Sequence, residues 1–121
     1  MHAPTQANVL HDHLIGRQGS RADLNTPALI IDAEALERNI AKMATFAKAN
    51  GLTLRPHAKT HKSAAIARLQ QAAGAVGVCC AKLGEAEALT DQGVEGILIT
   101  SPVVGAPAVQ RMAALAARAP T

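Results

Sequence analysis

Residues 75–102, AVGVCCAKLGEAEALTDQGVEGILITSP, contain two apolar segments on either side of a more polar one. The segments at 75–81 and 96–102 show no strict alternation of apolar and polar residues, which is typical of strands buried on both faces. The segment 84–93 between them predicts a short helix that ends at Gly93. A buried strand, a helix and a second buried strand predict a parallel sheet covered by helices, and therefore an α/β fold.

The same alternation continues on both sides of this stretch. Each unit of strand and helix takes roughly twenty residues, which is short but workable for a (β/α)8 barrel. A doubly wound open sheet shares this order, but its Gly-x-Gly-x-x-Gly turn does not follow the first strand. The remaining predicted elements are a strand at 26–32, a helix from Asp32 to Asn50, a strand at 52–59, a helix from Ser63 to Gly74 and a helix at 107–119.

The composition indicates how the core is built. Of the 121 residues, 49% are hydrophobic, and Phe46 is the only aromatic residue. A core of aliphatic residues and alanines suits close helix-on-strand packing better than a β-sandwich. The apolar positions at helical spacing, expected to face inward, are Leu36, Ile40, Met43 and Ala47 in the first helix, Ile66 and Leu69 in the second, and Val109, Met112 and either Leu115 or Ala116 in the last.

Charge and cysteine content argue against several classes of protein. The net charge is +3, and basic residues are not interleaved with aromatic ones, so no nucleic acid partner is predicted. Cys79 and Cys80 are adjacent, which is neither a disulfide framework nor a Cys-x-x-Cys site, and reduced thiols in the cytoplasm are expected. Residues 1–20 lack a secretory signal, and no apolar run is long enough to cross a bilayer, so no membrane partner is predicted.

The predicted domain organisation has two parts. Residues 1–25 are polar and irregular, and are expected to form an N-terminal arm. Residues 26–121 are expected to form the first part of a barrel domain. A closed eight-stranded barrel takes roughly 250 residues, so we expect the barrel to be incomplete in this chain.

The stretch LRPHAKTHKS, residues 54–63, places Arg55, His57, Lys59 and His61 at alternating positions. Residues two apart share one face of a strand, so Arg55, His57 and Lys59 are expected to converge. Lys59 lies where the strand passes into a helix, which is where barrel enzymes carry catalytic groups. Neighbouring positive charge and partial burial would favour its neutral amine, the form that makes a Schiff base.

Other interpretations of the polar residues are structural. A basic loop between a strand and a helix is commonly a solvated surface, and Lys62 is expected to point into solvent. His11, Asp12 and His13 resemble a metal site but lack a fourth ligand, so no metal ligand is predicted in the chain. Glu85 and Glu87 are expected on a helix surface because residues two apart do not face each other on a helix.

The motif RPHAKTHKS resembles the lysine motif Arg-Pro-His-x-Lys-Thr-His-Lys of the D-threonine aldolase and D-serine dehydratase-like family. These are fold-type III pyridoxal phosphate enzymes with an alanine racemase-like N-terminal barrel. Segments 16–44 and 81–105 also resemble the N-terminal part of that family, in the same order. The resemblance implies that this chain is the N-terminal part of a pyridoxal phosphate-binding (β/α)8 barrel.

Carried over by position, the resemblance makes Lys59 the catalytic lysine that binds pyridoxal 5'-phosphate as an imine. Arg55, His57 and His61 occupy surrounding motif positions and are implied to bind the cofactor. The resemblance also implies that residues 26–32 pair with a C-terminal β domain. A divalent metal is expected for full-length members, with ligands outside this chain.

The implied function is that of a lyase of D-amino acid metabolism resembling D-threonine aldolase. Such an enzyme cleaves small D-3-hydroxy amino acids, for example D-threonine to glycine and acetaldehyde. One alternative is a dehydratase acting on D-serine or D-3-hydroxyaspartate, which releases ammonia and a 2-oxo acid. Another is an inactive truncated remnant with no turnover. A full-length member is expected to be a homodimer.

Overall fold

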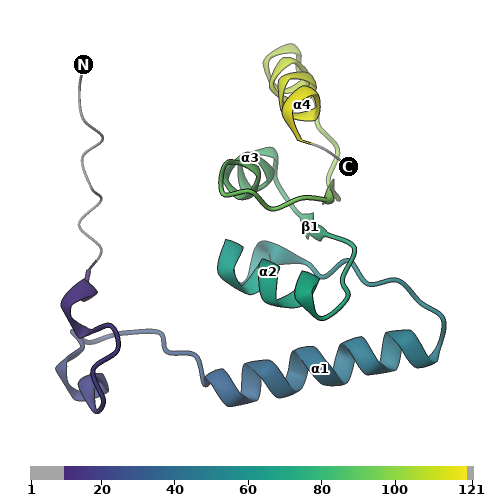
Figure 1. The fold of residues 1–121 in the computed structure, drawn as a ribbon. Helices are drawn as coiled ribbons and strands as arrows, with labels where there is room; N and C mark the ends of the chain where they lie inside the picture. The colour runs from purple at the N-terminus through teal and green to yellow at the C-terminus, as the bar shows by residue number, and fades with distance from the viewer. Residues whose placement is uncertain (1–9, 120–121) are drawn as a thin grey trace. The chain divides into compact units, whose positions relative to one another are not determined.

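A computed structural model of the chain describes residues 10–119, in two units, Met1–Asp32 and Ala33–Thr121 (Figure 1). The predicted arm at 1–25 therefore lies partly outside the described residues, as does the end of the predicted barrel domain at 26–121. No helix among the described residues has both the length and the apolar character needed to cross a membrane.

The first unit contains two short 3₁₀-helices, η1 (Asp12–Leu14) and η2 (Ser20–Asp23). Leu14 is buried, so this part of the arm is folded locally and not fully extended. The prediction of a strand at 26–32 is wrong, because these residues adopt no strand within the described chain. Leu29 to Ile31 are exposed there, and an extended segment is a strand only when another strand accepts its hydrogen bonds.

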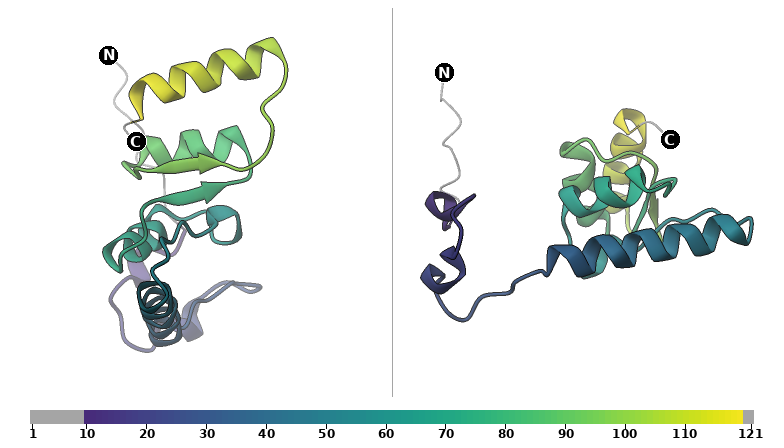
Figure 2. Two further views of the ribbon diagram at one scale, coloured as in Figure 1. Left: turned by 90° about the vertical axis from the view of Figure 1, so that its right-hand side faces the viewer. Right: turned by 60° about the horizontal axis from the view of Figure 1, so that its bottom comes forward.

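The second unit has an α/β fold with a parallel two-stranded sheet, as predicted. Strands β1 (Val78–Cys80) and β2 (Ile97–Ile99) pair in the register Val78 to Ile97 and Cys80 to Ile99. Figure 2 shows them side by side and pointing in the same direction. The helical elements are α1 (Ala33–Ala49), η3 (Ala58–Thr60), α2 (Ala64–Ala72), α3 (Leu83–Asp91) and α4 (Ala106–Arg118).

The strand predicted at 52–59 is reduced to a short extended segment beside β1. The amide of Val76 donates to the Leu54 carbonyl at 2.9 Å, and the amide of Cys79 donates to the Pro56 carbonyl at 2.7 Å. Only His57 forms a bridge, which is parallel and pairs with Cys79. Pro56 has no N–H to donate to a ladder, and η3 begins directly after His57, so a longer strand cannot form here.

The core is built from small aliphatic side chains, as the composition predicts. Its buried members include Val78, Cys80, Ala86, Leu89, Val94 and Leu115.

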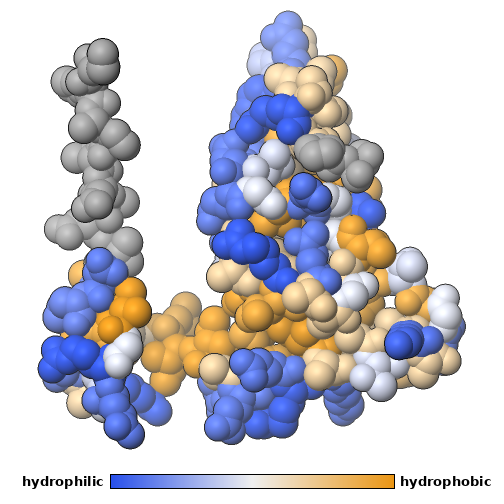
Figure 3. Space-filling view, in the orientation of Figure 1, coloured by the Kyte–Doolittle hydropathy of each residue, from blue (hydrophilic) through white to orange (hydrophobic). Residues whose placement is uncertain are grey.

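The inward faces predicted for the helices are only partly correct. Ala47, Ile66 and Leu115 are buried, whereas Leu69 is 45% and Val109 is 52% exposed. Met43, on α1, is also exposed, and Figure 3 shows hydrophobic surface between α1 and α2. Periodicity identifies an apolar helix face, but it does not determine whether the described chain covers that face.

Two glycines allow the strands to approach at their start. A Cβ atom on Gly77 would lie 1.8 Å from the Gly96 carbonyl oxygen, and one on Gly96 would lie 2.4 Å from the Val76 oxygen. Neither position has room for a side chain, and Gly96 has φ of 65°, which favours glycine further. This contact fixes where β1 and β2 begin relative to each other.

Candidate active site

The site begins at the carboxyl ends of three parallel segments, namely residues 54–57, β1 and β2. The three ends contribute His57, the Cys80 carbonyl and Thr100. Lys59 lies in η3, two residues after His57. In a βα barrel this edge is the one that carries catalytic groups.

His57 links Lys59 to the end of β2. Its Nδ1 accepts a hydrogen bond from the Lys59 backbone N–H at 3.3 Å, which caps η3. Its Nε2 lies 3.3 Å from Thr100 Oγ1, and that hydroxyl lies 3.2 Å from the Cys80 carbonyl, to which it donates. The Thr60 hydroxyl donates to the His57 carbonyl at 3.4 Å. The ring is therefore held from both sides, directly beside the Lys59 peptide.

Lys59 and Arg55 do not share the strand face that was predicted. The chain turns into η3 after His57, so Lys59 does not continue the alternation of a strand. Lys59 is exposed, and the partial burial expected for it is not observed. Arg55 is half-buried, and its carbonyl accepts from Cys79 Sγ at 3.3 Å. The structure therefore brings His57 to the backbone of Lys59 and does not line up four side chains.

His61 faces a different environment. Its Nδ1 accepts from the Ser63 backbone N–H at 3.1 Å, and its Nε2 is buried with no hydrogen bond of standard geometry inside the described part of the chain. Burial lowers the pKa of His61 from its usual 6.5, and the Ser63 N–H donates to a lone pair that only the uncharged ring presents on Nδ1. The neutral imidazole is therefore favoured near neutral pH.

Glu85 makes a connection that the sequence interpretation missed. Its Oε2 accepts from the Ala81 backbone N–H at 2.9 Å, and its Oε1 lies 3.3 Å from Lys62 Nζ. The Ala81 amide is the main reason why the pKa of Glu85 is lowered, and Lys62 adds to the effect. Lys62 is exposed, as expected, with 67% of its side chain accessible, and its ammonium also pairs with Glu85. A glutamate in the first turn of the helix at 84–93 was the available signal.

Glu87 lies on the helix surface, as predicted, where it forms an ion pair with Arg111 of α4. It therefore joins α3 to α4 and takes no part in the edge around Lys59.

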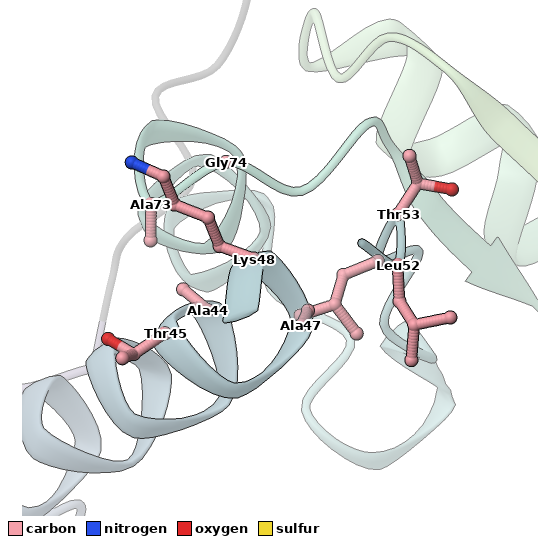
Figure 4. Close-up of a pocket in the computed structure, with 9 residues that line it drawn as sticks. Ala44, Thr45, Ala47, Lys48, Leu52, Thr53, Ala73 and Gly74 are labelled. Atoms are coloured by element: carbon pink, nitrogen blue, oxygen red, sulfur yellow. The ribbon is translucent and has the colours of Figure 1, made fainter. Parts of the chain in front are cut away.

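Several hollows border these elements. One of about 260 Å³ is next to η3 and is lined by residues that include Ala58, Lys62 and Glu85. Another of about 360 Å³ is lined by the second half of α1, residues 52–54 and the end of α2 (Figure 4). The second hollow lies at the amino ends of the parallel segments, where a barrel carries stabilising residues and not catalytic ones. Of these two hollows, the first is at the edge that carries Lys59.

Among residues 10–119, no group of three histidines, cysteines or carboxylates lies close enough to hold a metal ion. The rings of His11 and His13 have centroids 6.4 Å apart, and His11 Nε2 accepts from the Asn25 amide at 3.3 Å.

The groups around Lys59 fit one end of pyridoxal phosphate. An exposed primary amine is available to the cofactor aldehyde.

A parallel α/β unit with a lysine just beyond its strand ends matches the arrangement found at the catalytic edge of βα barrels. The sequence matches the family model described as alanine racemase, N-terminal domain, over residues 31–119. The chain therefore belongs to the alanine racemase N-terminal domain family, in agreement with the resemblance and the fold predicted from its sequence.

Three similar proteins have more specific names than the family. The chain is 45% identical over 95 residues to the 3-hydroxy-D-aspartate aldolase of Paracoccus denitrificans, covering 78% of this chain and 24% of the relative. It is 44% identical over 81 residues to the D-threo-3-hydroxyaspartate dehydratase of Delftia sp., covering 67% and 21%. The crystal structure of D-threonine aldolase from Filomicrobium marinum matches with a TM-score of 0.79 and 53% identity, covering 81% and 27%. The chain thus spans about a quarter of the length of these relatives.

Proposed function

We propose that this chain carries the cofactor lysine, Lys59, of a pyridoxal phosphate-dependent lyase that cleaves D-3-hydroxy amino acids. The observation that carries the proposal is the position of Lys59 in η3, directly after the carboxyl end of a parallel segment. Similarity to two aldolases and a dehydratase that act on such compounds supports the substrate class. D-Threonine, giving glycine and acetaldehyde, is the preferred substrate.

Each group of the site has a part in this proposal. The exposed Lys59 amine is the nucleophile that binds the cofactor aldehyde. When bound, the cofactor supplies an electron sink for the bond that breaks at Cα. His57 holds the Lys59 peptide through Nδ1, so it fixes where the lysine leaves the chain. Arg55 and His61 complete the proposed cofactor-binding set.

The two reaction types differ in the bond that breaks. In the aldolase, the hydroxyl proton is removed, the Cα–Cβ bond breaks, and Cα takes up a proton to give glycine. In the dehydratase, the Cα proton and the β-hydroxyl leave as water, and hydrolysis then gives ammonia and a 2-oxo acid. We prefer the aldolase because, among the solved structures, identity is 53% to the D-threonine aldolase and 39% to the dehydratase from Delftia sp.. A divalent metal that holds the β-hydroxyl is part of the proposal, with ligands outside this chain.

Product analysis tests the proposal. The purified chain is incubated with pyridoxal phosphate, a divalent metal salt and either D-threonine or D-3-hydroxyaspartate, and Lys59→Ala serves as the control. The aldolase predicts glycine and an aldehyde in equal amounts, with none from Lys59→Ala. Ammonia with a 2-oxo acid would instead establish the dehydratase. No product from either substrate would overturn turnover by this chain.

A further inference from the structure

A continuous hydrogen-bonded chain runs across the edge of the sheet beside Lys59. It begins at the Lys59 backbone N–H, passes through both nitrogens of His57 and the hydroxyl of Thr100, and ends at the Cys80 carbonyl. The Thr100 backbone N–H also donates to that carbonyl, at 2.9 Å. His57 and Thr100 are 43 positions apart in the sequence, so the fold alone brings them together.

The donors and acceptors of this hydrogen-bond network can be arranged in only one consistent way. The Lys59 backbone N–H can only donate, so His57 Nδ1 must present its lone pair. The Cys80 carbonyl can only accept, so the single hydrogen of the Thr100 hydroxyl goes to it. The Thr100 oxygen then accepts from His57, whose proton must lie on Nε2. The opposite tautomer would place two N–H groups against each other at Lys59.

We infer that Thr100 is a positioning residue that, together with the Lys59 peptide, fixes His57 as a neutral ring protonated on Nε2. Both ring nitrogens are then used by the protein, so His57 has neither a free lone pair nor a free N–H. His57 therefore lines the Lys59 site in a fixed orientation and does not accept a proton from Lys59. The role of His57 in catalysis rests on the function proposed above, whereas the assignment of its tautomer does not.

The sequence pattern suggested a different role for His57. A histidine two residues before Lys59 was expected to add positive charge to a cluster. In the network, the ring contributes a hydrogen-bond acceptor to the Lys59 backbone instead, and that contact requires the uncharged ring.

The test is nuclear magnetic resonance of the ring nitrogens in the full chain, labelled with nitrogen-15 in histidine and held at a pH where the imidazoles are neutral. His57→Gln assigns the His57 signals by their loss. Wild type and Thr100→Ser are expected to show one tautomer, with hydrogen on Nε2. Thr100→Val, which keeps the shape and removes the hydroxyl, is expected to raise the rate of exchange of that hydrogen with water at least tenfold.

A wild-type ring protonated on Nδ1, or averaged between tautomers, would overturn the inference, whether or not Thr100→Val folds. An unchanged exchange rate in a folded Thr100→Val would also overturn it. No cofactor or substrate is present in the experiment, so its result is independent of turnover. Failure of the proposed function would appear in the product analysis and leave the tautomer unaffected.

Discussion

Lys62 Nζ lies 3.3 Å from Glu85 Oε1, so the turn that follows Lys59 is joined to the first turn of α3. Lys62 has φ of 49°, a conformation that residues other than glycine seldom adopt. The other carboxylate oxygen of Glu85 binds the Ala81 amide at the end of β1. One carboxylate therefore holds the end of a strand, the start of a helix and the turn next to the proposed catalytic lysine.

Replacement of Glu85 tests this connection. Glu85→Ala loses the bonds to the Ala81 amide and to Lys62, so we expect Tm to fall by several degrees. Glu85→Gln keeps an oxygen for the amide and loses only the ion pair, so a smaller fall is expected. Thermal unfolding followed by circular dichroism measures both. Equal Tm values for wild type and Glu85→Ala would show that the carboxylate does not hold these elements together.

The contribution of Glu85 should depend on pH. Its pKa is lower in the folded chain than the usual 4.5, so the folded state favours the carboxylate. The stabilisation is therefore complete above about pH 5 and is lost as pH falls through the folded-state pKa. The difference in Tm between wild type and Glu85→Gln should shrink between about pH 6 and about pH 3. A difference that stays constant over this range would contradict the lowered pKa.

A second dependence of stability on pH is expected from the burial of His61. Burial lowers its pKa below 6.5, so the unfolded chain binds a proton more readily than the folded one. Stability should therefore rise with pH from about 5 to about 7. His61→Gln, which does not titrate, should make this part of the stability profile flatter. Denaturant unfolding at several pH values measures it, and equal slopes for the two proteins would contradict the prediction.

Cys80 should react slowly with alkylating reagents. Burial raises the pKa of the Cys80 thiol to about 11 from a usual value of 9.0. At about pH 8 the fraction of thiolate is then lower by a factor of about 100 than in the unfolded chain. Mass spectrometry of iodoacetamide adducts, with Cys79→Ser to isolate Cys80, measures the rate in the native and the denatured chain. Equal rates would show that the thiol is not buried.

The close approach of the strands can be tested with two glycines. Gly96→Ala places a Cβ atom 2.4 Å from the Val76 carbonyl oxygen, with φ of 65°. We expect a loss of about 2 kcal/mol or more in the free energy of unfolding. Gly84→Ala is the matched control, because a Cβ there meets nothing within 4 Å, and it should stabilise by about 0.5 kcal/mol. Tolerance of both changes would mean that the strands do not meet as described.

The sequence predicted regular elements well where local pattern determines them. The helix expected at 84–93 is observed as Leu83–Asp91, and the strands on either side of it are shorter than predicted but parallel. The strand expected at 52–59 is reduced to one bridge because Pro56 has no N–H to donate and η3 begins directly after His57. The prediction of a strand at 26–32 was wrong because a run of apolar residues does not itself supply a neighbouring strand to pair with.

The site was less predictable than the fold. The motif marked Lys59 and its neighbours, and Lys59 does lie at the end of a parallel segment. The contact of His57 with Thr100 could not be predicted, because it joins residues 43 positions apart that only the barrel-like order of segments brings together. The ion pair of Lys62 with Glu85 depends in the same way on how the turn after η3 meets α3.

The most direct test of the central claim is to identify the residue that binds pyridoxal phosphate. The chain is incubated with the cofactor, reduced with borohydride and digested, and the modified peptide is sequenced by mass spectrometry. Lys62, which lies in the same turn but pairs with Glu85, is the internal comparison. We predict that the adduct is on Lys59 and is lost in Lys59→Arg but not in Lys62→Arg. An adduct on Lys62, or one that survives in Lys59→Arg, would contradict the account.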